Sequence, residues 1–303
     1  MNKTEMISAK PFMQHYGIDI VDVNKVAKSF ANELIKAKKG ETSSVCFGPS
    51  NLMIDADSLL IKENLDLIAI DIGGTNFKAA KCKMNSADKS IEFSNVEIFK
   101  TPGSDFDLSS EQFFKIISNE ILELSKDIKE VSVGISAGLK GESTSDRDLL
   151  LDEACKELRI SSLAGCYFNK SLKRNLLPVE KFINIKTVND TTAALLSNLT
   201  SDNYIEYDLH IGVVLGTGFN LCFTDNSRND CSYEDIFVTE AGCFNKISRG
   251  YIDNLIDIDS ELPGDHVFEK MISGKYIPKL VNKCIEIAKE NGLISSSITS
   301  YFN

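Results

Sequence analysis

Residues 67–81, LIAIDIGGTNFKAAK, decide the fold prediction, because an apolar segment ends at Asp71 and a glycine turn leads straight back into a second strand-like segment. Gly73 and Gly74 allow a sharp turn and leave its backbone N–H groups uncovered by side chains, which suits a bound phosphate. Taken alone, the stretch is also compatible with an ordinary Gly-Gly hairpin.

The polar residues around this turn favour the phosphate interpretation. Thr75 and Asn76 supply short hydrogen-bonding groups, and Lys78 supplies a positive charge that attracts an anion. Asp71 repels a phosphate directly, but a carboxylate can hold a hydrated Mg²⁺ ion that binds one. The turn therefore predicts a site for a magnesium-bound phosphate group.

A second turn of the same design follows later in the chain. Residues 213–220, VVLGTGFN, consist of an apolar strand, the turn Gly216-Thr217-Gly218, and then Asn220. The recurrence of this design favours the phosphate interpretation of both turns over two ordinary hairpins.

Between the turns, residues 185–198, IKTVNDTTAALLSN, place Asn189 and Asp190 where a strand ends and a helix begins. Strand ends of this kind face the ligand in α/β sheets, so the Asp190 carboxylate can reach one. A simple helix N-cap is the alternative role for Asp190, and the two roles are compatible.

Length and composition limit the class of protein. The 303 residues are 43% hydrophobic, enough for two domains, and the net charge of -11 without a basic stripe argues against nucleic acid or an anionic membrane as partner. No apolar run reaches membrane-spanning length and the N-terminus lacks a secretion pattern, so we expect a cytoplasmic protein. Eight scattered cysteines without a CxxC pair predict reduced thiols rather than a metal site or a disulfide framework.

Hydrophobic spacing, caps and glycines predict the secondary structure. The first three strands should form an antiparallel meander, and the order β-β-β-α-β-α recurs in outline, which predicts two α/β halves with a cleft between them. Helices are expected at 23–40, from 109 with Ser109 and Gln112 as a capping box, at 191–199 and at 278–290, and strands at 67–71, 77–83, 91–100, 131–136, 183–188, 209–218 and 221–225.

Four motifs in this order resemble those of the eukaryotic hexokinase and glucokinase family, within the actin-like ATPase superfamily of sugar kinases. They are DIGGTNFK (71–78), VNDTTAALL (188–196), LGTGFN (215–220) and PGDHVFEKMISGKYI (263–277). The resemblance covers roughly residues 43 to 300. It implies two actin-like ATPase (ribonuclease H-like) domains with a central cleft: a small domain of residues 66–189, and a large domain of residues 1–65 and 190–303.

The resemblance also implies an activity and its residues. ATP and Mg²⁺ would be the cofactors, with Asp71 holding the metal through water, and Asp190 would act as general base on the 6-hydroxyl of glucose or a related hexose. Lys156 would lie near the transferring phosphoryl group. The ATP-binding residues would be Asp71, Gly73, Gly74, Thr75, Asn76, Lys78, Gly216, Thr217 and Gly218, and the sugar-binding residues Ser136, Cys155, Lys156, Asn189, Asp190, Asn220, Glu240 and Glu269.

The chain departs from the family pattern at several places. Ala137 and Gly138 follow Ser136 where the family has Phe-Pro, Ala241 stands where the family has tryptophan, and Lys78 replaces an arginine. Nothing after Ile294 resembles the family's adenosine-binding motif, so we expect a C-terminally shortened large domain, whose apolar surface a second copy or another protein could cover.

Three hypotheses follow. The first is an ATP-dependent hexokinase, and the second is a non-catalytic sugar-binding or regulatory relative. The third hypothesis is a nucleotide-binding structural protein of the actin type. The complete set of sugar ligands argues against it.

Overall fold

The computed structural model describes residues 9–17, 21–55, 64–88, 90–144, 146, 148–153, 158–177, 182–200, 207–225 and 233–297. Within it the chain forms two compact units. Unit 1 comprises residues 1–47, 214–221 and 239–303, and unit 2 comprises residues 48–213 and 222–238. The domain limits expected from the sequence stay a prediction.

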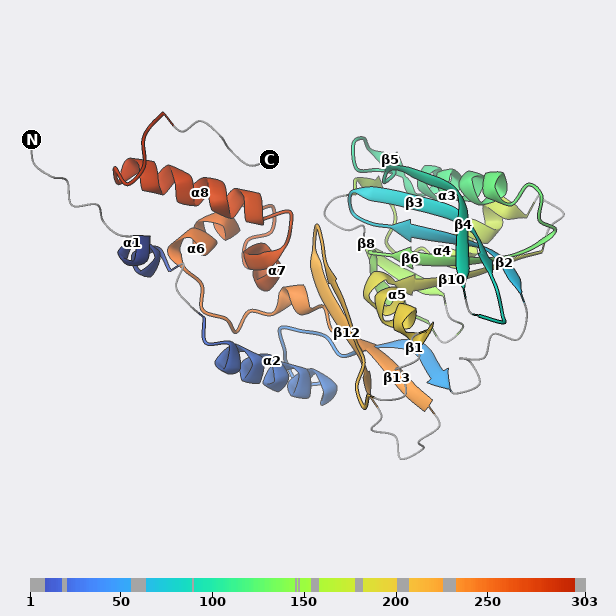
Figure 1. The fold of residues 1–303 in the computed structure, drawn as a ribbon, viewed down its shortest axis with the longest axis horizontal. Coiled ribbons are helices and arrows are strands. Elements are labelled where there is room, and N and C mark those ends of the chain that lie inside the picture. Colours follow the sequence, from blue (N-terminus) through green and yellow to red (C-terminus); the bar gives the residue numbers. More distant parts are fainter. Residues whose placement is uncertain are drawn as a thin grey trace, which may run out of the picture. The chain divides into compact units, whose positions relative to one another are not determined.

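The centre of unit 2 is a five-stranded mixed sheet in the order β10-β6-β2-β3-β4 (Figure 1). The antiparallel meander β2-β3-β4 is confirmed, while β6 pairs parallel with both β2 and β10. The strands are β2 (Leu65–Ile72), β3 (Asn76–Met84), β4 (Ile91–Lys100), β6 (Glu130–Ala137) and β10 (Phe182–Asn189).

Two helices cover this sheet through a shared apolar core. Alternate residues of β2 are buried, as a half-buried strand requires, and they belong to the same cluster as Phe113 and Ile117 of α3 (Ser110–Leu124) and Phe168 of α4 (Phe168–Leu176). The capping box predicted at the start of α3 is present: the Ser109 hydroxyl accepts the Gln112 N–H, and the Gln112 side-chain oxygen accepts the Ser109 N–H.

Smaller strand pairs complete unit 2. Strand β5 (Leu108–Ser109) pairs with β9 (Ile160–Ser161), and β7 (Lys140–Ser143) pairs with β8 (Leu149–Glu153). The helix expected at 191–199 is α5 (Asp190–Leu196), continued by the 3₁₀ turn η1 (Ser197–Thr200).

A four-stranded sheet has the order β1-β13-β12-β11. Its strands are β1 (Gly48–Asp55), β11 (Ile211–Leu215), β12 (Phe219–Asp225) and β13 (Tyr233–Val238). Leu195 of α5 packs with Cys222 and Ile236 of this sheet. The turn between β11 and β12 is the second glycine turn, and it belongs to unit 1.

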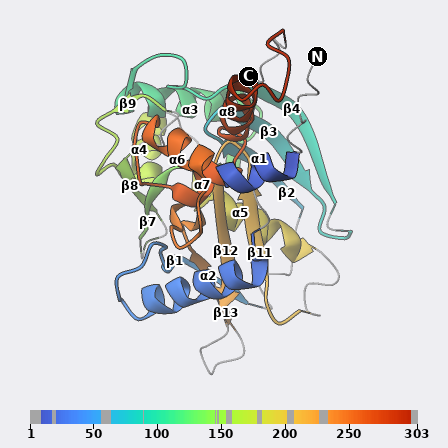
Figure 2. The same ribbon diagram turned by 90° about the vertical axis from the view of Figure 1, so that its left-hand side faces the viewer.

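Unit 1 is otherwise helical. Helices α6 (Tyr251–Ile258), α7 (Val267–Ile272) and α8 (Ile277–Glu290) pack on one another (Figure 2). The predicted helices at 23–40 and 278–290 are confirmed as α2 (Val23–Lys38) and α8. Among the residues that the structure describes, the remaining elements are α1 (Ala9–Tyr16) and the 3₁₀ turn η3 (Ala241–Cys243). The described residues include no helix with the length and apolar character that a bilayer crossing requires.

A buried carboxylate joins α2 to the segment before β1. Glu33 is only 2% exposed, and it accepts hydrogen bonds from the Ser44 N–H at 2.8 Å and from the Lys36 ammonium at 2.7 Å. The Lys36 hydrogen bond, followed by the Ser44 N–H, lowers the pKa of Glu33 to about 2. The ionised form of Glu33 therefore stabilises the fold.

Replacing this carboxylate by an amide should destabilise unit 1 at neutral pH. Glu33→Gln keeps the shape but loses the charge, so we expect the free energy of unfolding at pH 7 to fall by about 2 kcal/mol. A lowered folded-state pKa gives stability above the unfolded pKa of about 4.5 that disappears toward pH 2. Urea unfolding of the two proteins should therefore differ at pH 7, and the difference should disappear as the pH falls through about 2. If the free energies of unfolding of the two proteins differed equally at pH 7 and at pH 2, this role of the charge would be contradicted.

Candidate functional site

The register of the parallel strands gathers three motifs at one edge of the unit 2 sheet. Asp71 at the end of β2 pairs with Ser136 of β6, and Ser136 pairs with Val188 of β10. Asn189 and Asp190 follow directly. Because the strands are parallel, their carboxyl ends meet, and the side chains that leave them share one edge.

Asp71 is the centre of the contacts at this edge. Its Oδ1 accepts a hydrogen bond from the Ser136 hydroxyl at 3.1 Å, and its Oδ2 lies 3.2 Å from the Lys78 ammonium. Both Asp71 and Lys78 keep about half of their side-chain surface exposed. The carboxylate is thus held in place by two donors and remains open to solvent.

Two hydrogen bonds to the backbone of Gly73 close the first glycine turn. The Gly73 N–H donates to the Asn76 carbonyl at 3.0 Å, and the Thr101 hydroxyl donates to the Gly73 carbonyl at 2.6 Å. Thr75 and Asn76 are exposed. The turn therefore presents polar groups to solvent from a fixed backbone, as a phosphate site requires.

Asn189, rather than Asp190, caps helix α5. The Asn189 side-chain oxygen accepts the Thr191 N–H at 3.0 Å, and its backbone is extended as N-cap residues require. The alternative in which Asp190 is the cap is therefore wrong, since Asp190 is the first residue of the helix.

Asp190 combines burial with a neighbouring negative charge. Burial raises its pKa above the ordinary value, the Thr191 N–H at 2.8 Å acts in the opposite direction, and the charge of Asp71 raises the pKa further. A carboxylate in this setting is a stronger proton acceptor than an exposed one.

Gly138 allows the loop after β6 to approach Asp190. Its N–H donates to the Ile72 carbonyl at 3.0 Å, and a Cβ placed on it would lie 3.2 Å from Asp190 Oδ2. A side chain at position 138 would therefore come close to the Asp190 carboxylate.

In unit 1, Asn220 connects β12 to the predicted sugar ligand Glu240. The Asn220 amide donates to Glu240 Oε1 at 3.2 Å, while its oxygen accepts the Ala241 N–H at 3.0 Å. Glu240 has a left-handed backbone, with φ at 49°, which non-glycine residues rarely adopt. Two groups expected to bind sugar are therefore held against each other.

Glu269, on α7, is fixed by the second glycine turn. Its Oε2 accepts the Phe219 N–H at 3.0 Å, and a Cβ on Gly218 would lie 2.8 Å from the same oxygen. Only glycine at 218 leaves room for this contact. Gly274 also donates its N–H to the Gly216 carbonyl at 2.7 Å, so the turn is anchored from the far end of α7.

A buried ionic cluster fixes the segment that leads into α7. Asp257 of α6 contacts the Lys270 ammonium at 2.5 Å and the Arg249 guanidinium at 2.8 Å, and it accepts the Gly264 N–H at 3.0 Å. Burial acts to raise the pKa of Asp257, but these hydrogen bonds outweigh it and the pKa is lowered. The ion pairs of Asp257 and its hydrogen bond to Gly264 thus hold the start of α7, the helix that carries Glu269.

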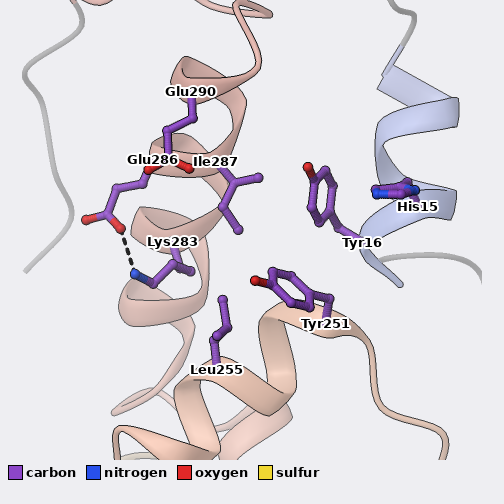
Figure 3. Close-up of a pocket in the computed structure, with 8 residues that line it drawn as sticks. All are labelled: His15, Tyr16, Tyr251, Leu255, Lys283, Glu286, Ile287 and Glu290. Carbon is purple, nitrogen blue, oxygen red and sulfur yellow. Dashed lines mark hydrogen bonds and ion pairs between the residues drawn. The ribbon is translucent and has the colours of Figure 1, made fainter.

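A separate cavity of about 410 Å³ lies in unit 1 among α1, α6 and α8 (Figure 3). The two tyrosine rings, Tyr16 and Tyr251, face α8, where Lys283 and Glu286 form an ion pair of 2.8 Å. Its lining contains no residue predicted to bind ATP or sugar, and comprises His15, Tyr16, Tyr251, Leu255, Lys283, Glu286, Ile287 and Glu290.

Two predicted residues, Cys155 and Lys156, lie outside the described residues. Two features carry no signal in the sequence: the packing role of Gly138, and a cluster of Cys243, Asp265 and His266 in unit 1. The cysteine and the histidine are distant in sequence and carry no motif spacing, so only folding brings them together.

The sequence matches two family profiles described as hexokinase, over residues 8–200 and 210–302. It is 27% identical over 248 residues to hexokinase-2, chloroplastic, of Nicotiana tabacum. The matched residues make up 74% of this chain and 48% of the relative. It is 26% identical over 262 residues to hexokinase-1 of Homo sapiens. Here the matched residues make up 78% of this chain and 27% of the relative. The chain thus spans about half the length of the first relative and about a quarter of the second.

Solved structures show the same fold. The hexokinase from Schistosoma mansoni complexed with glucose matches with a TM-score of 0.76 at 20% identity, over 94% of this chain and 67% of that one. Another hexokinase crystal structure matches with a TM-score of 0.73 at 21% identity, over 92% of this chain and 67% of that one. The predicted mixed α/β fold of the actin-like ATPase class is therefore confirmed.

Neutralising Asp190 should stabilise the protein. Asp190→Asn removes a charge that burial disfavours and keeps an oxygen to accept the Thr191 N–H, so we expect a higher melting temperature at pH 7. A raised folded-state pKa means that the wild type regains this stability as the pH falls and the carboxyl takes up a proton. Melting curves at pH 7 and pH 4 should therefore show the gain shrinking at the lower pH. A lower melting temperature for the variant at pH 7 would contradict the argument.

Proposed function

Because the chain belongs to the hexokinase family, we propose that it is an ATP-dependent hexokinase that phosphorylates the 6-hydroxyl of glucose or a related hexose. The observation that carries the proposal is the setting of Asp190, a partly buried carboxylate with a raised pKa at the end of a parallel strand. Asp71 and Ser136 occupy the same edge of the sheet.

Asp190 is the general base of this proposal. The sugar's 6-hydroxyl gives its proton to the Asp190 carboxylate, and the oxygen forms a bond to the γ-phosphorus of ATP. The bond between that phosphorus and the β,γ-bridging oxygen breaks, which yields ADP and hexose 6-phosphate. A raised pKa suits the role, because an acceptor whose pKa lies nearer neutral pH takes a proton more readily.

The two glycine turns are proposed to hold the phosphates of ATP. In support, the turn at Gly73 exposes Thr75 and Asn76 on a closed backbone, and Lys78 adds a cation nearby. Asp71 offers the hard oxygen that Mg²⁺ prefers, and Mg²⁺ would neutralise charge on the phosphates. The second turn would contribute Gly216, Thr217 and Gly218.

Hexose is proposed to bind to the polar side chains that the family resemblance assigns to it. Asn220, Glu240 and Glu269 offer amide and carboxylate groups, which can each fix adjacent hydroxyls in one orientation. Ser136 and Asn189 would add contacts. Cys155 and Lys156 are assigned to the sugar and the phosphoryl group from the resemblance alone.

One contact favours the second candidate, a sugar-binding relative without turnover. Lys78 lies 3.2 Å from Asp71, in an ion pair with the carboxylate that is assigned to Mg²⁺. A protein in which this pair persists would bind hexose without activating ATP.

Turnover separates the two candidates. The 303-residue chain with Mg-ATP should produce ADP only when glucose is present, and Asp190→Ala should lower this rate by about 10²-fold or more, because the proton acceptor is lost. A coupled assay that detects ADP measures the rate of the wild type and the rate of the variant.

Asp105→Ala is the matched control, since Asp105 is half-exposed in the same unit and pairs only with the surface residue Lys100 in the contacts described. Its rate should equal that of the wild type. Glucose that raises the melting temperature without any ADP production would instead establish the sugar-binding candidate.

The contact between the glycine turn and Glu269 predicts a second effect. In Gly218→Ala the added Cβ displaces the Glu269 carboxylate from the Phe219 N–H, so glucose affinity should fall by about tenfold. The glucose dependence of the melting temperature measures this affinity.

Gly134→Ala is the control for this variant, because a Cβ on Gly134 meets no atom within 4 Å. Its affinity for glucose should match that of the wild type. Unchanged affinity in Gly218→Ala would remove Glu269 from the set of sugar ligands.

A further inference from the structure

Three side chains of the kinds that bind transition metals meet in unit 1. Cys243, Asp265 and His266 each offer one ligand atom, and these atoms all lie within 4.8 Å of one another. Cys243 ends the 3₁₀ turn η3, while Asp265 and His266 directly precede α7. The cluster therefore joins two separate segments of the chain.

Packing around the cluster holds these two segments together. A Cβ on Gly242 would lie 3.2 Å from the Cβ of Glu269, so the turn η3 rests closely against α7. The rings of Phe244 and Phe268 meet edge to face, with centroids 5.9 Å apart. Cys243 is thus held beside His266 by contacts that do not involve the three ligands.

The imidazole of His266 has a nitrogen without a hydrogen bond. Nδ1 is buried and makes no hydrogen bond within the described part of the chain, although Asp265 Oδ2 is 2.9 Å away. The side chain of Asp265 is 47% exposed, so the cluster can be reached from solvent. A buried ring nitrogen next to a carboxylate and a thiol is a ready donor for a metal ion.

We propose that Cys243, Asp265 and His266 bind one Zn²⁺ ion. Zinc takes sulfur, nitrogen and oxygen ligands together, whereas Mg²⁺ and Ca²⁺ prefer oxygen alone. With bonds of about 2.0 to 2.3 Å in tetrahedral geometry, ligand atoms lie about 3.5 Å apart, which small side-chain rotations can reach from the present cluster. Three protein ligands leave the fourth position to water.

The position of the cluster gives the ion a regulatory consequence, which rests on the proposed function. Cys243 lies one short turn after Glu240, and His266 lies on the segment that enters the helix of Glu269. A bound ion would therefore fix the two predicted sugar ligands relative to each other. We expect Zn²⁺ to change the affinity for glucose.

Cobalt titration tests the metal site directly. Co²⁺ added to the reduced, metal-free full chain should give a thiolate-to-cobalt charge-transfer absorption that saturates at one equivalent and disappears when Zn²⁺ is added. Cys243→Ser should abolish the absorption, and His266→Gln should weaken Co²⁺ binding by about tenfold or more. Circular dichroism of the metal-free variants verifies that they fold.

Cys284→Ser is the matched control, because Cys284 is a half-buried free thiol on α8 of the same unit. It should keep the full absorption. A wild-type spectrum without a thiolate band, or a band that survives in Cys243→Ser, would overturn the proposal.

Glucose affinity with and without Zn²⁺ separates this inference from the proposed function. A change in the wild type that is lost in Cys243→Ser supports the regulatory consequence, and an equal affinity in both conditions overturns it. Failure to bind glucose at all would count against the proposed function, while the cobalt spectra would still decide the metal site.

Discussion

The parallel pairing of β2, β6 and β10 is the constraint on which the candidate site in unit 2 depends. This register puts Asp71, Ser136 and Asn189 at adjoining strand ends, and the chain then starts α5 with Asp190. A shift of one residue in either pair would turn the side chains to opposite faces of the sheet. The buried residues of these strands belong to the apolar core that includes α3 and α4. Packing in this core therefore fixes the positions of the polar side chains at the strand ends.

In unit 1 the corresponding constraint is close backbone approach. Gly218 and Gly242 are positions where a Cβ would meet the Glu269 side chain, and Gly274 binds the Gly216 carbonyl. The carboxylate of Glu269 is thus oriented by backbone rather than by flexible side chains. Glu240 completes this arrangement in a strained left-handed conformation, which persists because Asn220 binds both its carboxylate and the following N–H.

Much of this arrangement could be predicted from the sequence, because its signals are local. The glycine turn after Asp71 and the capping box at Ser109 each lie within a few residues, and both are present in the structure. The sequence does not decide whether Asn189 or Asp190 is the N-cap of α5, because the side chains of both can accept the Thr191 N–H. The metal-type cluster at Cys243 was not predictable, because its members come from segments joined only by tertiary packing.

The division of the chain leaves neither unit as one continuous stretch of sequence. The backbone passes between the units at 47–48, 213–214, 221–222 and 238–239. A protease that cuts the chain once at such a passage would produce two fragments, neither of which corresponds to a folded unit. A cut at 213–214 or 221–222 leaves β1 and β13 on different fragments, so their pairing would keep those fragments associated until the two strands separate. A denaturing gel would then report cleavage long before the native particle comes apart.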